Sequence, residues 1–218
     1  MITFLADDHY GTHPGAMLYE ALRDRFEMAF YENDLSPLTH ASFAGECDLL
    51  ILSLIADTGG QPLAGPEAER NLRAYLELGK PLLLIHGGSA AFWHWPWWRG
   101  IVGYRWVRGN DPDGVEASTH PIRPYRVDVA KSRHPLCKEL QSMELGEDEI
   151  YTRLEQTHPA TILMETTTLE GTFPQCWECA TPWGGRVLGF LPGHRKEIVQ
   201  DKRLVANVAR LITSLLEG

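Results

Sequence analysis

Short apolar runs recur along the first 85 residues, as expected of strands inside a sheet. Residues Ile2–Ala6, Phe26–Tyr31 and Pro81–Ile85 are three such runs. The run Asp48–Ile55, with the sequence DLLILSLI, is nearly continuous, which is typical of a parallel strand buried on both faces. The pattern therefore predicts four strands in this part of the chain.

Segments with helical spacing separate these strands. A helix is predicted to begin at Pro14, because four apolar residues that follow share one face: Met17, Leu18, Ala21 and Leu22. A second helix is predicted to begin at Gly65–Pro66 and to end at Gly79. Strands that alternate with helices in this way indicate an α/β fold with a doubly wound, mostly parallel sheet.

The second half is less regular. Five of the seven tryptophans lie between Trp93 and Trp106, a segment without clear periodicity. Further strands are predicted at Tyr125–Val129, Thr161–Glu165 and Arg186–Phe190, and an amphipathic helix is predicted at Lys202–Leu216. Since no repeat or linker interrupts the pattern, we expect a single domain over residues 1–218.

The turn after the fourth strand is the most informative local feature. Its sequence is LLLIHGGSAAF, in which an apolar strand runs into His86 and two glycines before helix-like residues. We expect the glycines to allow a sharp turn and close approach of a ligand, and the following helix to direct free N–H groups there. Hydrolases place a nucleophilic Ser or Cys at such a turn, whereas here it carries a histidine.

Other histidines follow other predicted strands. His9 and His13 come after the first strand, and His194 comes after the strand Arg186–Phe190. Ligands of open parallel sheets bind beyond the carboxyl ends of the strands, so we expect these imidazoles to meet at one rim. Each histidine alone is also compatible with an ordinary surface or capping residue.

Charge and cysteine content exclude several classes of function. A formal net charge of −9 argues against a nucleic-acid or anionic-membrane partner and favours a small, uncharged or polar ligand. The N-terminal apolar run is too short for a signal peptide or a membrane span, so we expect a cytoplasmic protein. Cys176 and Cys179 form a lone C-x-x-C, which we interpret as packing positions rather than a metal or redox motif.

Several motifs together resemble the ThuA-like (trehalose utilisation) family, a branch of the flavodoxin-like, class I glutamine amidotransferase-like fold. The resemblance extends over nearly the whole chain and depends on the order of its motifs: LLLIHGGSAAF with His86, Thr119-His120-Pro121, His134-Pro135-Leu136, EDEIY with Asp148, Glu149 and Tyr151, Pro174-Gln175-Cys176-Trp177, and GGRVLGFLPGH ending at His194. The family usually has G-x-G-R-V in the last of these, and Gly184-Gly185-Arg186-Val187 is a small variation on it.

True class I amidotransferases place a nucleophilic cysteine where this chain has His86, and a His-x-Glu after a late strand. His194 is followed by Glu197 three residues later, which is close to that pattern but not equal to it. Because imidazole cannot form the thioester intermediate, glutaminase activity is not expected. Ser53 and Ser89 lack the G-x-S-x-G environment of a nucleophilic serine, so an amidase is disfavoured.

The resemblance implies an enzyme of carbohydrate metabolism that acts on a sugar or keto-sugar derivative in a lyase, isomerase or hydrolase step. We expect His86, His194 and Glu149 to carry out the acid–base chemistry. The expected substrate-binding residues come from the same motifs and loops: His9, His13, Asp148, Tyr151 and Trp177. Most tryptophans are assigned to packing in the core or a subunit interface, with Trp177 as the preferred pocket residue.

Two alternatives remain open from the residues. His86, His194 and Glu149 are also suitable ligands for a divalent metal such as zinc, although no closely spaced ligand motif requires one. The chain could instead be a non-catalytic sugar-binding or partner-binding module that kept an amidotransferase-like scaffold without the nucleophile. The sequence does not determine whether the protein forms a homo-oligomer.

Overall fold

The computed structural model describes residues 1–58, 61–109 and 111–217. Within them, a nine-stranded sheet has the order β2-β1-β3-β4-β11-β10-β9-β6-β7. Its first five strands are parallel, which confirms the predicted α/β fold: β1 (Ile2–Ala6), β2 (Met28–Glu32), β3 (Leu49–Ser53), β4 (Leu82–Ile85) and β11 (Arg186–Phe190).

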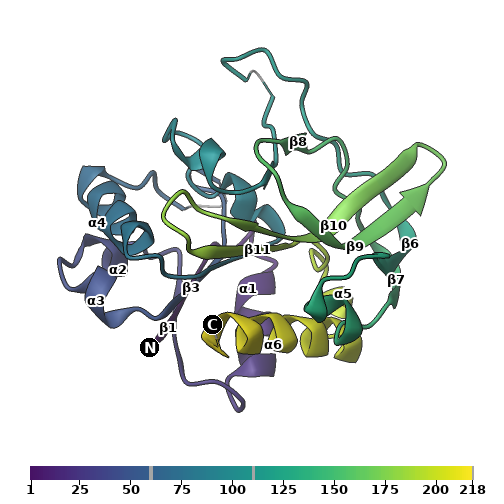
Figure 1. Ribbon diagram of the computed structural model, residues 1–218, viewed down its shortest axis with the longest axis horizontal. Helices are drawn as coiled ribbons and strands as arrows, with labels where there is room; N and C mark the ends of the chain where they lie inside the picture. Colours follow the sequence, from purple (N-terminus) through teal and green to yellow (C-terminus); the bar gives the residue numbers. More distant parts are fainter. Residues whose placement is uncertain (59–60, 110, 218) are drawn as a thin grey trace.

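The rest of the sheet is an antiparallel extension, seen at the right in Figure 1. It consists of β10 (Gly171–Ala180), β9 (Thr161–Thr168), β6 (Ile122–Val129) and β7 (Met143–Glu149). The sequence pattern did not predict β7 or β10. β7 has the sequence MELGEDE, in which four of seven residues are acidic, and it pairs only with β6 at the sheet edge. β10 is interrupted by Pro174 and irregular in register. A small separate sheet joins β5 (Tyr104–Arg105) to β8 (Glu155–Gln156).

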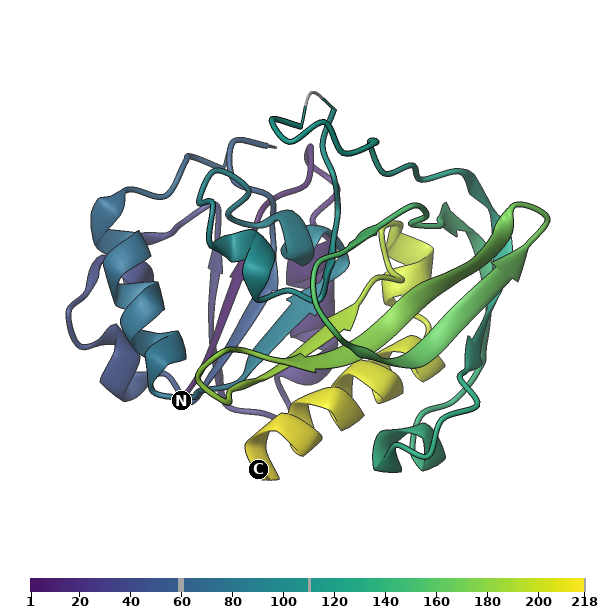
Figure 2. The same cartoon turned by 45° about the horizontal axis from the view of Figure 1, so that its top comes forward.

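Helices cover both faces of the parallel half. One face packs against α1 (Pro14–Leu22), α5 (Lys196–Val199) and α6 (Lys202–Glu217), and the other against α2 (Ser36–Thr39), α3 (Phe43–Glu46) and α4 (Pro66–Glu77). Figures 1 and 2 show yellow α6 beside purple α1, with the blue helices grouped apart from them. None of the helices in the described ranges is long and apolar enough to span a membrane.

Strand β3 shows why a continuous apolar run forms a central strand. Leu49 and Ile51 pack into the core on the α1/α6 side, whereas Leu50 and Leu52 pack into the core on the α4 side. Successive side chains of a strand point to opposite faces, so both sets must be apolar when both faces are covered. Truncation of any one of them to alanine is expected to cost about 2–5 kcal/mol.

The turn after β4 differs from the prediction in two respects. His86–Ala90 forms a short 3₁₀ helix, η1, rather than the start of an α-helix. The two glycines serve packing: a Cβ on Gly88 would lie 2.4 Å from the carbonyl oxygen of Leu52, and a Cβ on Gly87 would lie 2.7 Å from the Ile55 side chain. The strained residue is His86 itself, whose φ of 50° lies in the left-handed region that non-glycine residues rarely adopt.

The tryptophan-rich segment caps the α4 side of the sheet. It includes the short 3₁₀ helix η2 (Trp98–Gly100), and Trp95 and Trp98 are buried there against Phe92. A third 3₁₀ helix, η3 (Pro135–Lys138), lies at the far end of the antiparallel extension. Trp97 and Trp106 pack, partly buried, against the same core, whereas Trp93 is 40 % exposed.

Candidate active site

Three histidines meet at the carboxyl ends of the parallel strands. His9 follows β1, His86 follows β4 and His194 follows β11. One ring nitrogen of each lies within 4.8 Å of the others, and His194 Nδ1 is 3.2 Å from His86 Nε2. We call His9, His86 and His194 the histidine cluster. Their convergence arises because parallel strands bring the loops that follow them to one edge of the sheet.

His86 has a defined orientation at the centre of this cluster. The side chain is only 3 % exposed, and its Nδ1–H donates to the carbonyl oxygen of Leu191 over 3.0 Å. Because a carbonyl can only accept, the proton on Nδ1 is fixed and Nε2 is the atom that faces the cluster. The left-handed backbone at His86 is the kind of strain that accumulates at functional sites.

Glu149, the last residue of β7, joins the histidines through both of its carboxylate oxygens. Oε2 lies 3.5 Å from His86 Nε2 and 3.5 Å from His194 Nδ1. Oε1 lies 3.0 Å from His120 Nδ1. Since the His120 side chain is 48 % exposed, it connects the buried carboxylate to solvent. Sequence reasoning did not assign His120 to the site, although it lies in the Thr-His-Pro motif already noted.

Tyr151 completes the contacts of His86. Its hydroxyl lies 3.0 Å from His86 Nε2, and the Trp106 ring packs against its ring with centroids 4.4 Å apart. Burial raises the pKa of Tyr151 well above its usual value, so the phenol stays protonated. Trp106, and not Trp177, is thus the tryptophan that contacts the site.

The pKa values of the two central histidines are shifted in opposite directions. Burial lowers the pKa of His86, but the hydrogen bond and negative charge of Glu149 outweigh burial and raise it overall. Burial and the neighbouring His86 lower the pKa of His194 to about 4. Burial alone would raise the pKa of Glu149, but its contact with His86 and the charge of the histidines lower it to about 2. Glu149 is therefore ionised at neutral pH and His194 is neutral.

Asp148 holds the backbone of the site and has no exposed surface to offer a substrate. Its carboxylate accepts the backbone N–H groups of Gly193, His194 and Arg195 at 2.9–3.2 Å, and the residue is 0 % exposed. Asp7 acts similarly: one oxygen accepts the Ile55 N–H at 2.9 Å, and the other lies 3.7 Å from His9 Nδ1.

Two further residues expected to bind substrate lie apart from the cluster. The exposed His13 pairs through Nδ1 with Glu32 at 2.9 Å at the start of α1. Trp177 is 0 % exposed and its indole N–H donates to the carbonyl oxygen of Val102, so the structure places it in the core.

The remaining candidate nucleophiles and thiols are also structural. The Ser89 hydroxyl is buried and accepts the backbone N–H of Trp106, and Ser53 is buried at the end of β3. Cys176 and Cys179 belong to core clusters on opposite sides of the sheet, because three residues along a strand reverse the face. Burial raises the pKa of Cys179 to about 12, which keeps it a thiol.

The histidine cluster has spacings that suit a bound metal. Two nitrogens bound to one zinc ion at tetrahedral angles lie about 3.3 Å apart. The distances of 3.2 Å between His86 and His194, and of 3.5 Å from each to Glu149, are close to that value. The Nδ1–H bond from His86 to Leu191 is the outer contact that metal-bound imidazoles commonly make. His9, His86 and His194, with Glu149 beside them, are the residues that could hold a divalent ion.

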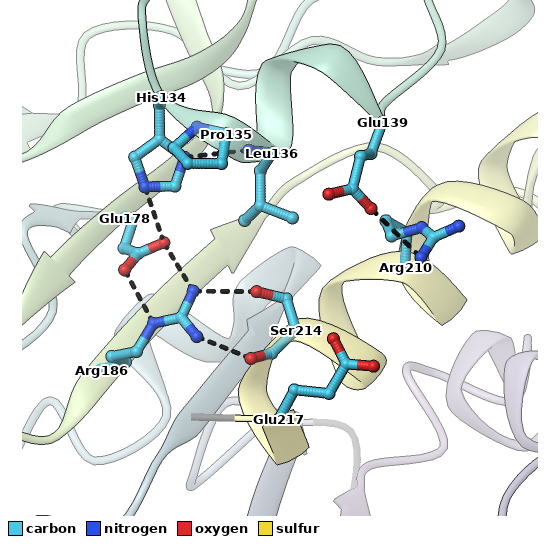
Figure 3. A pocket seen from close by; sticks show the side chains of 9 residues that line it. All are labelled: His134, Pro135, Leu136, Glu139, Glu178, Arg186, Arg210, Ser214 and Glu217. Carbon is cyan, nitrogen blue, oxygen red and sulfur yellow. Dashed lines mark hydrogen bonds and ion pairs between the residues drawn. The ribbon is translucent and has the colours of Figure 1, made fainter.

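A separate surface pocket of about 330 Å³ is lined by residues of η3, β10, β11 and α6 (Figure 3). Both of its arginines are paired with carboxylates. Arg186 donates to both carboxylate oxygens of Glu178 and to Ser214, and Arg210 pairs with Glu139. Because these pairs satisfy the cationic groups, we assign no ligand to this pocket.

Comparison with known proteins agrees with this architecture. A family model described as trehalose utilisation (ThuA) matches residues 8–212. A putative ThuA-like protein from Parabacteroides merdae is similar in structure, with a TM-score of 0.77 and 18% identity over 96% of this chain and 88% of that one. One from Bacteroides uniformis has a TM-score of 0.70 and 16% identity over 99% of this chain and 91% of that one.

A cold-adapted β-galactosidase from Rahnella sp. R3 is more distant. Its TM-score is 0.55 at 13% identity, and the match covers 98% of this chain but 31% of the galactosidase. All three likenesses show the fold alone. A search of curated protein sequences found no match.

Proposed function

Because the chain belongs to the trehalose utilisation (ThuA) family, we propose that it is an enzyme that transfers protons on a sugar or keto-sugar derivative. The single observation that carries this proposal is the contact between His86 and His194, two imidazoles with opposite pKa shifts beside an ionised carboxylate. When neighbouring titratable groups have their pKa values driven apart, one is suited to donate a proton and the other to accept one.

His86 is the proton donor in this scheme. Glu149 stabilises its protonated form, and three acceptors surround Nε2: the Tyr151 hydroxyl oxygen, His194 Nδ1 and Glu149 Oε2. A substrate oxygen that replaces one of these contacts would receive the proton as charge develops on it. His120 then returns a proton from solvent by way of Glu149.

His194 is the proton acceptor. It is neutral at physiological pH, 20 % exposed, and held in place through its backbone by Asp148. In the proposed step, His194 takes a proton from the carbon next to a keto-sugar carbonyl, and His86 protonates the carbonyl oxygen to give an enediol. In an isomerase step, the former carbonyl carbon takes a proton, and the hydroxyl on the adjacent carbon loses its proton as the new carbonyl forms. In a lyase step, the hydroxyl that His86 protonated loses its proton as the carbonyl re-forms, and the glycosidic oxygen is expelled and takes a proton.

Direct hydrolysis by a pair of carboxylates is less well supported. Such enzymes use two carboxyl groups that both reach the scissile bond. Here Glu149 faces the histidine cluster, but Asp148 is occupied by three backbone N–H groups and Asp7 by the N–H of Ile55. Proton transfer next to a carbonyl needs only the imidazoles and Glu149.

A divalent metal bound by His9, His86 and His194 would polarise a substrate oxygen. Metal binding requires His86 to lose its Nε2 proton, so the ion and the proton compete for the same atom. Glu149 and Tyr151 would then contact the substrate rather than share a proton with His86.

Deuterium exchange tests the proposal. A 3-keto-disaccharide incubated with the protein in D₂O should gain deuterium next to the carbonyl, as measured by NMR, and the gain should fall at least about a hundredfold in His86→Asn and His194→Asn. His40→Asn, an exposed histidine outside the site, is the matched control. Sugar binding with no exchange above background in the wild-type protein would support the non-catalytic module instead.

A further inference from the structure

We propose that Arg108, held against the face of Trp93, forms an anion-binding subsite beside the histidine cluster that binds a carboxylate or phosphate group of the sugar substrate. The Arg108 Cζ lies 4.5 Å from the centroid of the Trp93 ring. This inference rests on the proposed function for the identity of the sugar, but the anion site itself is tested by binding alone.

Arg108 differs from the other arginines in how its charge is compensated. Ten arginines have a carboxylate oxygen within 4.0 Å. Within the described residues, five arginines have none, and four of these are exposed: Arg25, Arg73, Arg133 and Arg203. Arg108 is the half-buried one. A partly desolvated guanidinium without a counter-charge is costly, and an anionic ligand would offset that cost.

Most of the hydrogen-bonding capacity of Arg108 is open. A guanidinium has five N–H donors, and among the described residues Arg108 makes one long hydrogen bond, from Nη1 to the carbonyl oxygen of Ala56 at 3.4 Å. The same carbonyl accepts the Trp93 indole N–H at 2.8 Å. The Trp93 ring and the Ala56 carbonyl thus contact the guanidinium and, among the described residues, leave its other N–H groups open for the paired hydrogen bonds that carboxylates and phosphates accept.

Two series of contacts and chain neighbours link Arg108 to the histidine cluster. The Ala56 carbonyl accepts hydrogen bonds from both Arg108 and Trp93. The preceding residue, Ile55, donates its N–H to Asp7, which lies next to His9. On the other side, Trp106 precedes Arg108 by two residues and packs on Tyr151, which contacts His86. A sugar with its carbonyl at His86 could therefore extend a charged substituent to Arg108.

Calorimetric titration of the full chain with D-glucuronate, D-glucose 6-phosphate and methyl glucoside tests the subsite. The wild-type protein should bind at least one anionic sugar about tenfold or more tightly than the neutral glucoside, and Arg108→Gln should remove that preference. Arg73→Gln is the matched control, because Arg73 lies 5.2 Å from the Trp97 ring but is exposed on α4. Titration with inorganic phosphate and with acetate separates a phosphate site from a carboxylate site.

The same titrations in His194→Asn distinguish this inference from the proposed function. This variant removes the proposed proton acceptor but keeps Arg108, so it should still prefer anionic sugars. If the proposed catalysis is wrong but the subsite exists, anionic sugars still bind selectively, and that selectivity is still lost in Arg108→Gln. Equal affinity of the wild-type protein for neutral and anionic sugars would overturn the subsite. The same conclusion follows if Arg108→Gln and Arg73→Gln reduce the preference equally.

Discussion

Asp148 and His194 are joined through the backbone: the carboxylate of Asp148 accepts the N–H of His194 at 3.2 Å, while the adjacent Glu149 contacts the imidazole. Two consecutive carboxylates therefore have different tasks. One fixes the loop that carries His194, and the other sets the charge of the histidine cluster. This division leads to the first prediction.

Replacing Asp148 with Asn should mainly reduce stability. An amide oxygen cannot accept all three backbone N–H groups that the carboxylate binds, so we expect a loss of about 1–3 kcal/mol in the free energy of unfolding. Glu149→Gln should abolish deuterium exchange into the keto-sugar, because the amide cannot stabilise protonated His86. It should also cost stability at neutral pH, because folding lowers the pKa of Glu149 to about 2. Urea denaturation with the exchange assay checks both, and exchange that persists in Glu149→Gln would contradict the division of tasks.

Acid should destabilise the protein through His194 between about pH 6.5 and pH 4. The unfolded chain binds a proton at this histidine near its usual pKa of about 6.5, whereas the folded chain binds it only near pH 4. Over that window the unfolded state holds more protons, so stability falls as the pH falls, by up to about 3 kcal/mol. In His194→Asn this part of the acid sensitivity should disappear.

His86 should show the opposite behaviour. Its pKa is raised on folding, so its contribution to stability is complete below the unfolded pKa and is lost as the pH rises through the folded value. An NMR titration of the imidazole protons should show His86 titrating above His194. The reverse order would remove the donor and acceptor assignment.

Zinc should stabilise the protein more at high pH than at low pH. Metal binding displaces the His86 proton, so the rise in Tm on adding Zn²⁺ should increase from pH 6 to pH 8. His9→Asn should lower the affinity for Zn²⁺ about 10- to 100-fold and so reduce the rise in Tm. His13→Asn should not, because His13 lies on the same loop but pairs with Glu32. A Tm shift that is the same in both variants would exclude His9 as a ligand.

Gly88→Ala should be destabilising because of packing rather than backbone angle. The added Cβ would lie 2.4 Å from the Leu52 carbonyl oxygen, so η1 must move away from β3 at a cost of about 1–3 kcal/mol. Gly45→Ala, in α3, is the control, since a Cβ there meets nothing within 4 Å and is expected to be neutral or slightly stabilising. Thermal denaturation of both variants checks the difference.

The sequence determined the parallel half of the sheet and the loops that carry the site. DLLILSLI could be identified as a central strand because its apolar residues fill both faces, and the helices begin at prolines as predicted. His86, His9 and His194 could be assigned to one rim because the carboxyl ends of parallel strands share an edge. These are consequences of local periodicity and of a general rule of topology.

Contacts between distant residues were decided only by the tertiary structure. Trp177 and Asp148 are of residue types that often contact ligands. The fold nevertheless buries Trp177 in the core and uses Asp148 to hold a loop. His120 and Trp106 lie in irregular segments, and only the folding of the antiparallel extension brings them to Glu149 and Tyr151. Residue type and spacing along a strand determine which face a side chain occupies. Hydrogen-bond partners that are 45 to 108 residues apart in the site depend instead on how the strands pair, and no local pattern encodes that pairing.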